Sequence, residues 1–343
     1  MRNVILGLIS LCSLSACFVS CSNNPTPENK TVSKDTVAKP KWQDPQRGKI
    51  WGKVNYVQIP LTAMENHILG PVKSVRYTDF KISEKDGSRE LDDSGYNVYD
   101  KAGHLIDQNE YSKDGKPKWK CVYNYDDQNR ATLWDIKVYR SKNMSQVTFI
   151  YDDKGRKIEQ NEVAAKKEDS RRLVYKYDDK GNEIEEMEYY GDRKPWTTTV
   201  KYDSRGYQTE YAHRDQTGRL LMKMTQEYDS AGNRISGATY TSDTVMKGRW
   251  TAKNDSKGRC TELVTYSKDG TLRSTTKMKY DDWDNLIEDI NYKPDGSIDT
   301  AGWNSYTDFE YDSHGNPIKE TWYKLRSGKK VVTDVAEKKY EYY

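Results

Sequence analysis

The sequence is short of apolar residues and cysteines, and each shortage removes a class of structure. Hydrophobic residues make up 34% of the 343 positions and the mean hydropathy is −1.04, which taken alone is typical of a disordered chain. Of the five cysteines, only Cys121 and Cys260 lie beyond the N-terminal segment. These two cysteines lie more than five repeats apart, so an extended repeat array should keep them from meeting. We therefore expect two buried thiols rather than a disulfide.

Histidines and catalytic motifs are also scarce. The four histidines stand apart from one another and from cysteine, so zinc-ligand spacing is absent. The chain has no Gly-rich phosphate loop and no Gly-x-Ser-x-Gly elbow. The sequence thus predicts no metal, no cofactor and no catalytic residue.

Tyrosine and tryptophan are plentiful instead, with 27 Tyr and 9 Trp. Aromatic rings bury large areas, so they can stabilise a thin sheet in which aliphatic residues are sparse. The chain has 56 basic and 53 acidic residues, and removal of a leader containing Arg2 would leave it nearly neutral. That balance, without an evident basic stripe, argues against nucleic acid as a partner.

The N-terminal 21 residues are typical of a targeting segment. Arg2 precedes an apolar run over 4–14 that is too short to span a membrane. The next residues, 14–17, resemble the lipobox of bacterial lipoprotein signal peptides, which predicts a lipid on Cys17. The alternative is Cys21, at the end of 18–21. Neither cysteine is followed by Asp or by an acidic tract, which favours the outer membrane and its periplasmic face.

Residues 22–41 are polar and predict a disordered tether. Residues 42–71 predict an N-terminal cap, in which Thr62–Leu69 begins with a capping box and forms a short helix covering the first edge of the sheet. The region 72–343 is a repeat domain.

The repeat is Tyr-Asp-x-x-Gly, and it returns about every 26 residues. Its aspartates are Asp100, Asp126, Asp152, Asp178, Asp203, Asp229, Asp255, Asp281 and Asp312. The glycines three residues later are Gly103, Gly155, Gly181, Gly206, Gly232, Gly258 and Gly315, with Asn129 and Asp284 at the two exceptions. Tyrosine precedes the Asp everywhere except at Asn254.

This signature predicts a tight turn that ends one strand and starts the next. The glycine is expected at positive φ, so Gly181→Val should cost roughly 1–3 kcal/mol. Gly237 lies in a strand outside the signature, and its substitution is expected to cost less. Each unit has a second turn halfway along, which predicts two strands per repeat and an all-β, elongated, solenoid-like sheet of antiparallel hairpins.

The sequence motif seen in Tyr123–Asp126, Tyr175–Asn182 and Tyr228–Asn233 resembles the YD repeat, also called the RHS repeat. The resemblance covers about residues 72–343. The resemblance implies a long spiralling sheet of β-hairpins. The chain lacks the core segment and toxin domain of large RHS proteins, and it is most similar to small lipoproteins of Bacteroidota, for which the resemblance implies no established activity.

Two sets of side chains are candidates for function. Glutamates recur seven residues after the Asp and predict a ladder facing Lys or Thr, although two carboxylates could also hydrolyse a glycoside. Tryptophans recur in the second half of the repeat and predict stacking on sugar rings, or packing within the sheet; they are Trp119, Trp196, Trp250 and Trp303. We predict a non-catalytic envelope lipoprotein that binds a glycan or a protein, with an enzyme acting on polysaccharide as the alternative.

Overall fold

The computed structural model describes residues 68–139, 143–164, 169–302, 304–326 and 329–343. These residues form 20 β-strands and no α-helix, and every strand pair with a recorded register is antiparallel. The all-β prediction is therefore confirmed. Cys17, Cys21, the tether, Trp303 and the predicted helix up to residue 67 lie outside the described residues, and Ile68 and Leu69 are not helical.

The chain divides into two compact units, each considered by itself. Unit 1 contains residues up to 120 and from 276 onwards. Its strands are Val72–Ile82 (β1), Arg89–Tyr99 (β2), Leu105–Ser112 (β3), Leu286–Tyr292 (β17), Ser305–Tyr311 (β18), Pro317–Arg326 (β19) and Lys329–Tyr342 (β20). The strands Pro117–Tyr125 (β4) and Leu272–Tyr280 (β16) contain the two boundaries between the units.

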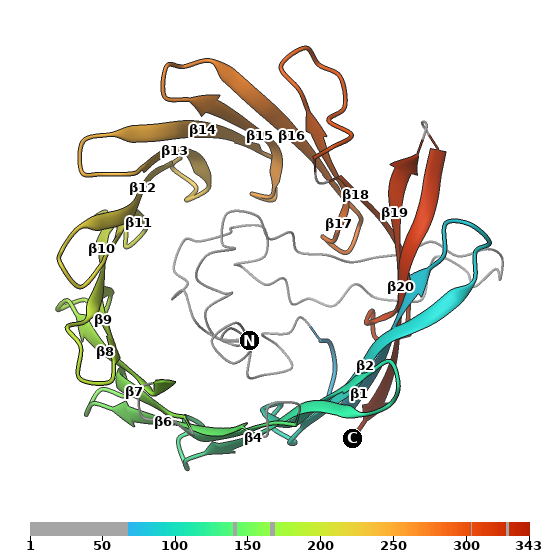
Figure 1. The fold of residues 1–343 in the computed structure, drawn as a ribbon, viewed down its shortest axis with the longest axis horizontal. Helices are drawn as coiled ribbons and strands as arrows, with labels where there is room; N and C mark the ends of the chain where they lie inside the picture. Colours follow the sequence, from blue (N-terminus) through green and yellow to red (C-terminus); the bar gives the residue numbers. More distant parts are fainter. Residues whose placement is uncertain (1–67, 140–142, 165–168, 303, 327–328) are drawn as a thin grey trace. The chain divides into compact units, whose positions relative to one another are not determined.

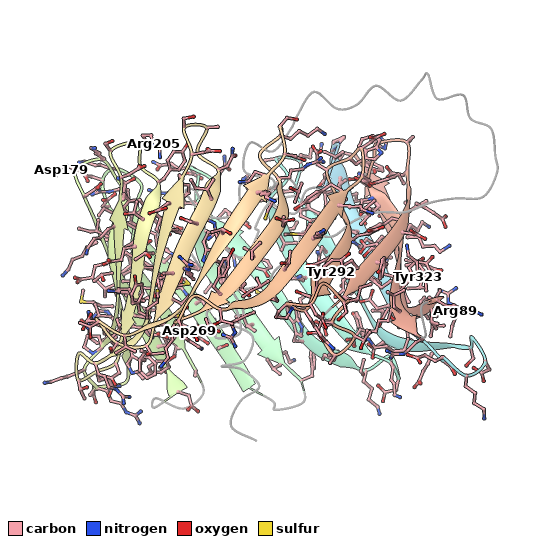
Figure 2. The ribbon with its side chains drawn as sticks, turned by 90° about the horizontal axis from the view of Figure 1, so that it is seen from above. Arg89, Asp179, Arg205, Asp269, Tyr292 and Tyr323 are labelled. Carbon is pink, nitrogen blue, oxygen red and sulfur yellow. The ribbon has the colours of Figure 1, made fainter. Side chains whose placement is uncertain are left out.

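Unit 2 spans 121–275. Its strands are Ala131–Val138 (β5), Asn143–Tyr151 (β6), Lys157–Val163 (β7), Arg171–Tyr177 (β8), Glu183–Tyr190 (β9), Trp196–Tyr202 (β10), Gln208–Arg214 (β11), Leu220–Tyr228 (β12), Arg234–Tyr240 (β13), Met246–Asn254 (β14) and Cys260–Ser267 (β15). Each strand from β5 to β15 pairs with the next one along the chain. In Figure 2, Asp179 and Arg205 mark Tyr-Asp turns at one end of these strands, and Asp269 marks an intermediate turn at the other end.

Each Tyr-Asp turn is closed by the aspartate. In the turn of Asp178, one carboxylate oxygen accepts the backbone N–H of Lys180 and of Asn182, and the other accepts the Asn182 amide. The third residue after the Asp has positive φ throughout, including Asn129 at 61° and Asp284 at 68°. Those two residue types tolerate the left-handed region better than most, because their short side chains bond locally.

The tyrosine of the signature ties one repeat to the preceding one. The hydroxyl of Tyr177 donates to the carbonyl oxygen of Lys157 at 2.6 Å, and Tyr151, Tyr202 and Tyr228 make the corresponding bonds. Asn254, the one departure from tyrosine, donates its amide to the carbonyl of Arg234 at 2.9 Å. The chemistry that the position requires is therefore a donor long enough to reach the neighbouring backbone.

The prediction of a solenoid-like sheet with two separate edges is wrong for the ends of the repeat domain. The first strand, β1, pairs with β2 on one side and with the last strand, β20, on the other, as the blue and red strands of Figure 1 show. Arg76 lies opposite Lys339, and the Tyr343 N–H donates to the Pro71 carbonyl. Because β20 occupies the edge of β1, neither strand is left as an unpaired template.

The two faces of unit 2 differ in exposure. Along β14, Lys247, Arg249, Thr251 and Lys253 are exposed, while Gly248 between them is buried. Along β8, Arg172 and Lys176 are exposed, while Arg171, Leu173 and Tyr175 are buried. Successive strand residues point to opposite faces. We call these two sides of unit 2 the exposed face and the buried face.

Candidate binding surface

A row of tyrosines crosses the exposed face of unit 2. Tyr189 on β9, Tyr240 on β13 and Tyr266 on β15 are half-buried. Each lies opposite a basic residue of the preceding strand. The cations lie over the rings, with Arg172 at 5.5 Å from the Tyr189 centroid, Lys223 at 4.4 Å from Tyr240 and Arg249 at 5.0 Å from Tyr266. These contacts hold the rings in place on a solvated face.

The sequence contains a signal for this row, a tyrosine at a fixed position of the repeat, which the pattern of tryptophans does not reveal. Tyrosine stands eleven residues after the turn aspartate in six of the nine repeats: Tyr111, Tyr189, Tyr240, Tyr266, Tyr292 and Tyr323. Tyr292 and Tyr323, labelled in Figure 2, belong to β17 and β19 of unit 1, where Lys277 lies 5.3 Å from the Tyr292 ring centroid. A repeated ring at one register position marks one face of a hairpin array.

The tryptophans lie on the other side of their strands. Trp196 shares a face of β10 with buried Thr198, because residues two positions apart point to the same side of a strand. The centroid of the Trp196 ring is 5.4 Å from that of His213. Trp250 is two residues from buried Gly248, and Arg234 lies 5.2 Å from its ring centroid. Both belong to unit 2 and are half-buried, so their use in stacking on a ligand stays a prediction.

Trp119 belongs to unit 1 and is also half-buried. Its indole N–H donates to a carboxylate oxygen of Glu110 at 2.6 Å. The ring is therefore positioned by a charge-assisted hydrogen bond.

The repeated glutamates form cross-strand ion pairs on the exposed face. Glu185 meets Lys176 at 2.6 Å and Glu210 meets Lys201 at 2.7 Å. Corresponding pairs are Arg172–Glu159, Lys253–Glu262 and Lys279–Glu288. The hydrogen bond from Arg172 lowers the pKa of Glu159, which keeps that carboxylate ionised. A general acid needs the opposite shift, so this ladder suits a solvated surface better than glycoside hydrolysis.

The cations are not evenly spread. Lys247, Arg249 and Lys253 lie on the exposed face of β14. Of these, Lys253 forms the ion pair with Glu262 at 2.6 Å. The near-neutral balance of the whole sequence did not reveal this local basic strip, because it averages over both units.

Neither a metal centre nor a membrane helix emerges from the described ranges. No group of three His, Cys, Asp or Glu residues in them is arranged to hold a metal ion. No helix among the same residues is long and apolar enough to cross a membrane. Cys121 is buried, as predicted, while Cys260 is half-buried.

Stability should rise as the pH falls from about 8 to about 5. In unit 1, Asp79 lies opposite Asp93, and burial together with acidic neighbours raises the pKa of Asp79 to about 6. The folded state therefore binds a proton that the unfolded chain has already released, so this contribution is present below the folded pKa and is lost as the pH rises through it. The effect of Asp79 is at most about 3 kcal/mol.

Urea unfolding at several pH values measures this effect. The midpoint should be higher near pH 5 than near pH 8, and Asp79→Asn should reduce the difference. Below about pH 4 the turn aspartates act in the opposite direction, because hydrogen bonds lower the pKa of groups such as Asp178. A midpoint that is higher at pH 8 would contradict the assignment.

Comparison with known proteins places the chain in no family. No family model matches it, and no curated protein resembles it. A porin-like protein from Bacteroides uniformis ATCC 8492 shares 12% identity, with 80% of this chain and 98% of that chain covered and a TM-score of 0.35. A porin-like protein from Bacteroides vulgatus ATCC 8482 shares 12% identity, with 79% and 98% covered and a TM-score of 0.28.

The Tc holotoxin pore of Photorhabdus luminescens shares 13% identity, and the match covers 70% of this chain and 16% of that one with a TM-score of 0.24. At these identities and TM-scores the likenesses assign no activity to the chain. The resemblance to the YD repeat, drawn from the sequence motifs, stays a prediction.

Proposed function

We propose that the chain is a non-catalytic protein of the cell envelope that binds an extended polysaccharide along the exposed face of unit 2. The supporting observation is the row of Tyr189, Tyr240 and Tyr266, each backed by a cross-strand cation. Anchoring through a lipid on Cys17, or on Cys21, is the remainder of the proposal, and it rests on the leader sequence.

The row suits a polymer better than a single sugar. Neighbouring strands lie about 4.8 Å apart, so rings on alternate strands, such as β13 and β15, are spaced by roughly 10 Å. A sugar ring can stack on each phenol, and the phenol hydroxyl can bond a sugar hydroxyl. One contact is weak, but several on one rigid surface act together, because the first contact makes the others intramolecular.

The charged surroundings support a solvated, non-catalytic role. The carboxylates of the exposed face meet Lys or Arg across the strands, at 2.6 Å for Lys176–Glu185 and 2.7 Å for Lys201–Glu210. A carboxylate already held by a cation is a poor general acid. The alternative of an enzyme predicts release of new reducing ends from a bound polysaccharide, whereas the proposed module returns its ligand intact.

Loss of two rings should weaken glycan binding about 10–100-fold, since each aromatic contact contributes about 0.5–1.5 kcal/mol. The variant is Tyr240→Ala with Tyr266→Ala, measured on an array of oligosaccharides of increasing length. Binding by the unmodified chain should rise steeply with length, and monosaccharides should not compete. Both rings are on the solvated face, so circular dichroism should be unchanged.

Two controls locate the surface. Tyr240→Phe with Tyr266→Phe retains the rings and should retain most of the affinity. Trp196→Ala changes a ring on the buried face and should leave affinity unchanged if the tyrosines form the surface. Normal binding by the Tyr-to-Ala variant together with loss in the Trp196 variant would transfer the site to the opposite face. No length-dependent binding to any glycan would end the proposal.

A further inference from the structure

The buried face of unit 2 carries a group of charged side chains that the tyrosine row does not use. Glu162 on β7 lies opposite Arg171 on β8, and Tyr175 on β8 lies opposite Glu186 on β9. Directly opposed residues of antiparallel strands project to the same face. We call this group the acidic cluster; its members are Glu162, Arg171, Tyr175, Glu183, Glu186 and Glu188.

Negative charge exceeds positive charge in the acidic cluster. Arg171 Nε lies 2.6 Å from a carboxylate oxygen of Glu188, which also accepts the Tyr190 hydroxyl at 2.7 Å. Among the described residues of this face, the other cation is Lys157, whose ammonium lies 4.4 Å from the centroid of the Tyr175 ring. Within that part of the chain, four carboxyl groups face two cations. Such an excess in a poorly hydrated place is unfavourable, and it is offset either by proton uptake or by a further cation.

The hydroxyl of Tyr175 is independent evidence that a hydrogen-bond partner is missing on this face. Tyr175 is 5% exposed, and its hydroxyl oxygen has no hydrogen-bond partner among the described residues. Tyr175 lies directly opposite Glu186 across the β8–β9 pair, so the two side chains share the buried face. Burial, followed by the charges of Glu186 and Glu183, raises the pKa of Tyr175. Buried polar groups normally have partners, and the Tyr175 hydroxyl has none among the described residues.

Aromatic rings border the same carboxylates. Trp196 on β10 lies directly opposite Glu188, and it is half-buried. Aromatic faces attract organic cations, and the ammonium of Lys157 over Tyr175 is an example within the chain. A metal ion prefers a compact set of oxygen ligands, and none of the described residues form one.

We propose that the acidic cluster binds a ligand that carries an organic ammonium group. An ammonium has three N–H donors, which match the carboxylates of Glu183 and Glu186 and the oxygen of Tyr175. Its charge offsets the excess of negative charge, and its carbon skeleton lies towards Trp196. This site is on the opposite face from the tyrosine row, and it does not depend on glycan binding there.

Binding of the ammonium should release protons near neutral pH. Burial and the neighbouring Glu186 raise the pKa of Glu183 to about 7, and a bound cation lowers it again. The charged and titratable groups around Glu183 and Glu186 are Lys157 and Glu162 on β7, Arg171, Tyr175 and Tyr177 on β8, Glu188 and Tyr190 on β9, Tyr202 on β10 and, beside Glu188, His213 on β11. Affinity should therefore be higher at pH 8 than at pH 5, where the carboxyl groups take up protons.

The test is titration calorimetry of the mature chain with cadaverine and glucosamine, and with pentanediol as a neutral probe. Choline carries a cation without N–H donors, so it should bind more weakly than the two amines. We expect a Kd below about 1 mM for at least one amine and no binding of pentanediol. Proton release is read from the dependence of the heat on the buffer. Glu186→Gln should weaken binding about tenfold or more, because it removes a charge but retains the shape.

Glu185→Gln is the matched control. Glu185 is the adjacent residue on β9, points to the exposed face and pairs with Lys176 at 2.6 Å, so its loss should leave amine affinity unchanged. Tyr175→Phe removes the unpartnered hydroxyl without reducing the fold's packing, and it should weaken binding severalfold. Failure of every amine to bind, or equal effects of Glu185→Gln and Glu186→Gln, would overturn the proposal. The Tyr240 and Tyr266 variants should bind the amine normally, which separates this outcome from the glycan experiment.

Discussion

Gly237→Val should destabilise the protein by more than about 3 kcal/mol, well above the cost of Gly181→Val. A Cβ atom at Gly237 would lie 2.4 Å from the carbonyl oxygen of Thr225 and 2.6 Å from the ring of Trp250. Neither neighbour can simply withdraw, because Thr225 belongs to the preceding strand, β12, and Trp250 lies directly opposite the glycine on β14. Thermal unfolding followed by circular dichroism measures the difference.

Gly181 provides the comparison. It has φ of 84° and nothing within 4 Å of a Cβ atom, so a substitution there meets backbone strain but no collision. Its cost stays in the range of roughly 1–3 kcal/mol. The contacts around the two glycines therefore lead to the opposite order from the one expected from the sequence alone. A glycine in a tight turn was easy to recognise from its motif, whereas a glycine beneath an aromatic ring had no sequence mark of its own.

Two further variants identify the cause of the effect at Gly237. Gly237→Ala introduces only the colliding Cβ atom and should already be strongly destabilising, while Gly181→Ala should cost about 1 kcal/mol. Adding Trp250→Ala to Gly237→Ala removes one of the two collisions and should recover part of the loss. Equal melting temperatures for the two alanine variants would show that the packing at Gly237 is misassigned.

Asn316→Ala should cost about 3–4 kcal/mol, because both the N–H and the carbonyl of Leu69 lose their partner and each buried polar group left unsatisfied costs about 1–3 kcal/mol. Asn316 is 0% exposed. Its oxygen accepts the Leu69 N–H at 2.6 Å, and its amide donates to the Leu69 carbonyl at 2.7 Å and to the Tyr342 hydroxyl at 2.7 Å. One side chain thus joins the entry to β1, the last Tyr-Asp turn and β20.

Asn182 occupies the same position in the turn of Asp178 and serves as the control. Its amide donates to the Asp178 carboxylate at 2.9 Å and is only half-buried. Asn182→Ala should therefore cost about 1 kcal/mol, the usual contribution of one hydrogen bond. Urea unfolding of both variants gives the comparison. Similar midpoints would mean that the contact between Leu69 and Asn316 contributes little to the pairing of the chain ends.

Function could be anticipated from the sequence only in outline. The sequence predicted that the tryptophans stack on a ligand, but Trp196 and Trp250 share their side of the strands with buried Thr198 and Gly248. The exposed row is made of tyrosines. The period contained that row, yet which of two alternating faces meets water depends on packing, and alternation alone does not specify it. The raised pKa of Glu183 depends likewise on burial and on Glu186, which lies only three residues away but on a crowded face.

The sequence by itself determined the strands, the turns and their register. A Tyr-Asp-x-x-Gly motif acts within five residues, and hairpin pairing joins neighbours in the chain, so both are local consequences of the repeat. Even Asn254 follows the rule, because it keeps the donor that reaches the backbone of Arg234. Only the tertiary structure decided that β1 pairs with β20, that Asn316 holds Leu69, and which side chains are buried. These contacts join residues about 250 positions apart, and a period of 26 residues contains no information about which distant strands meet.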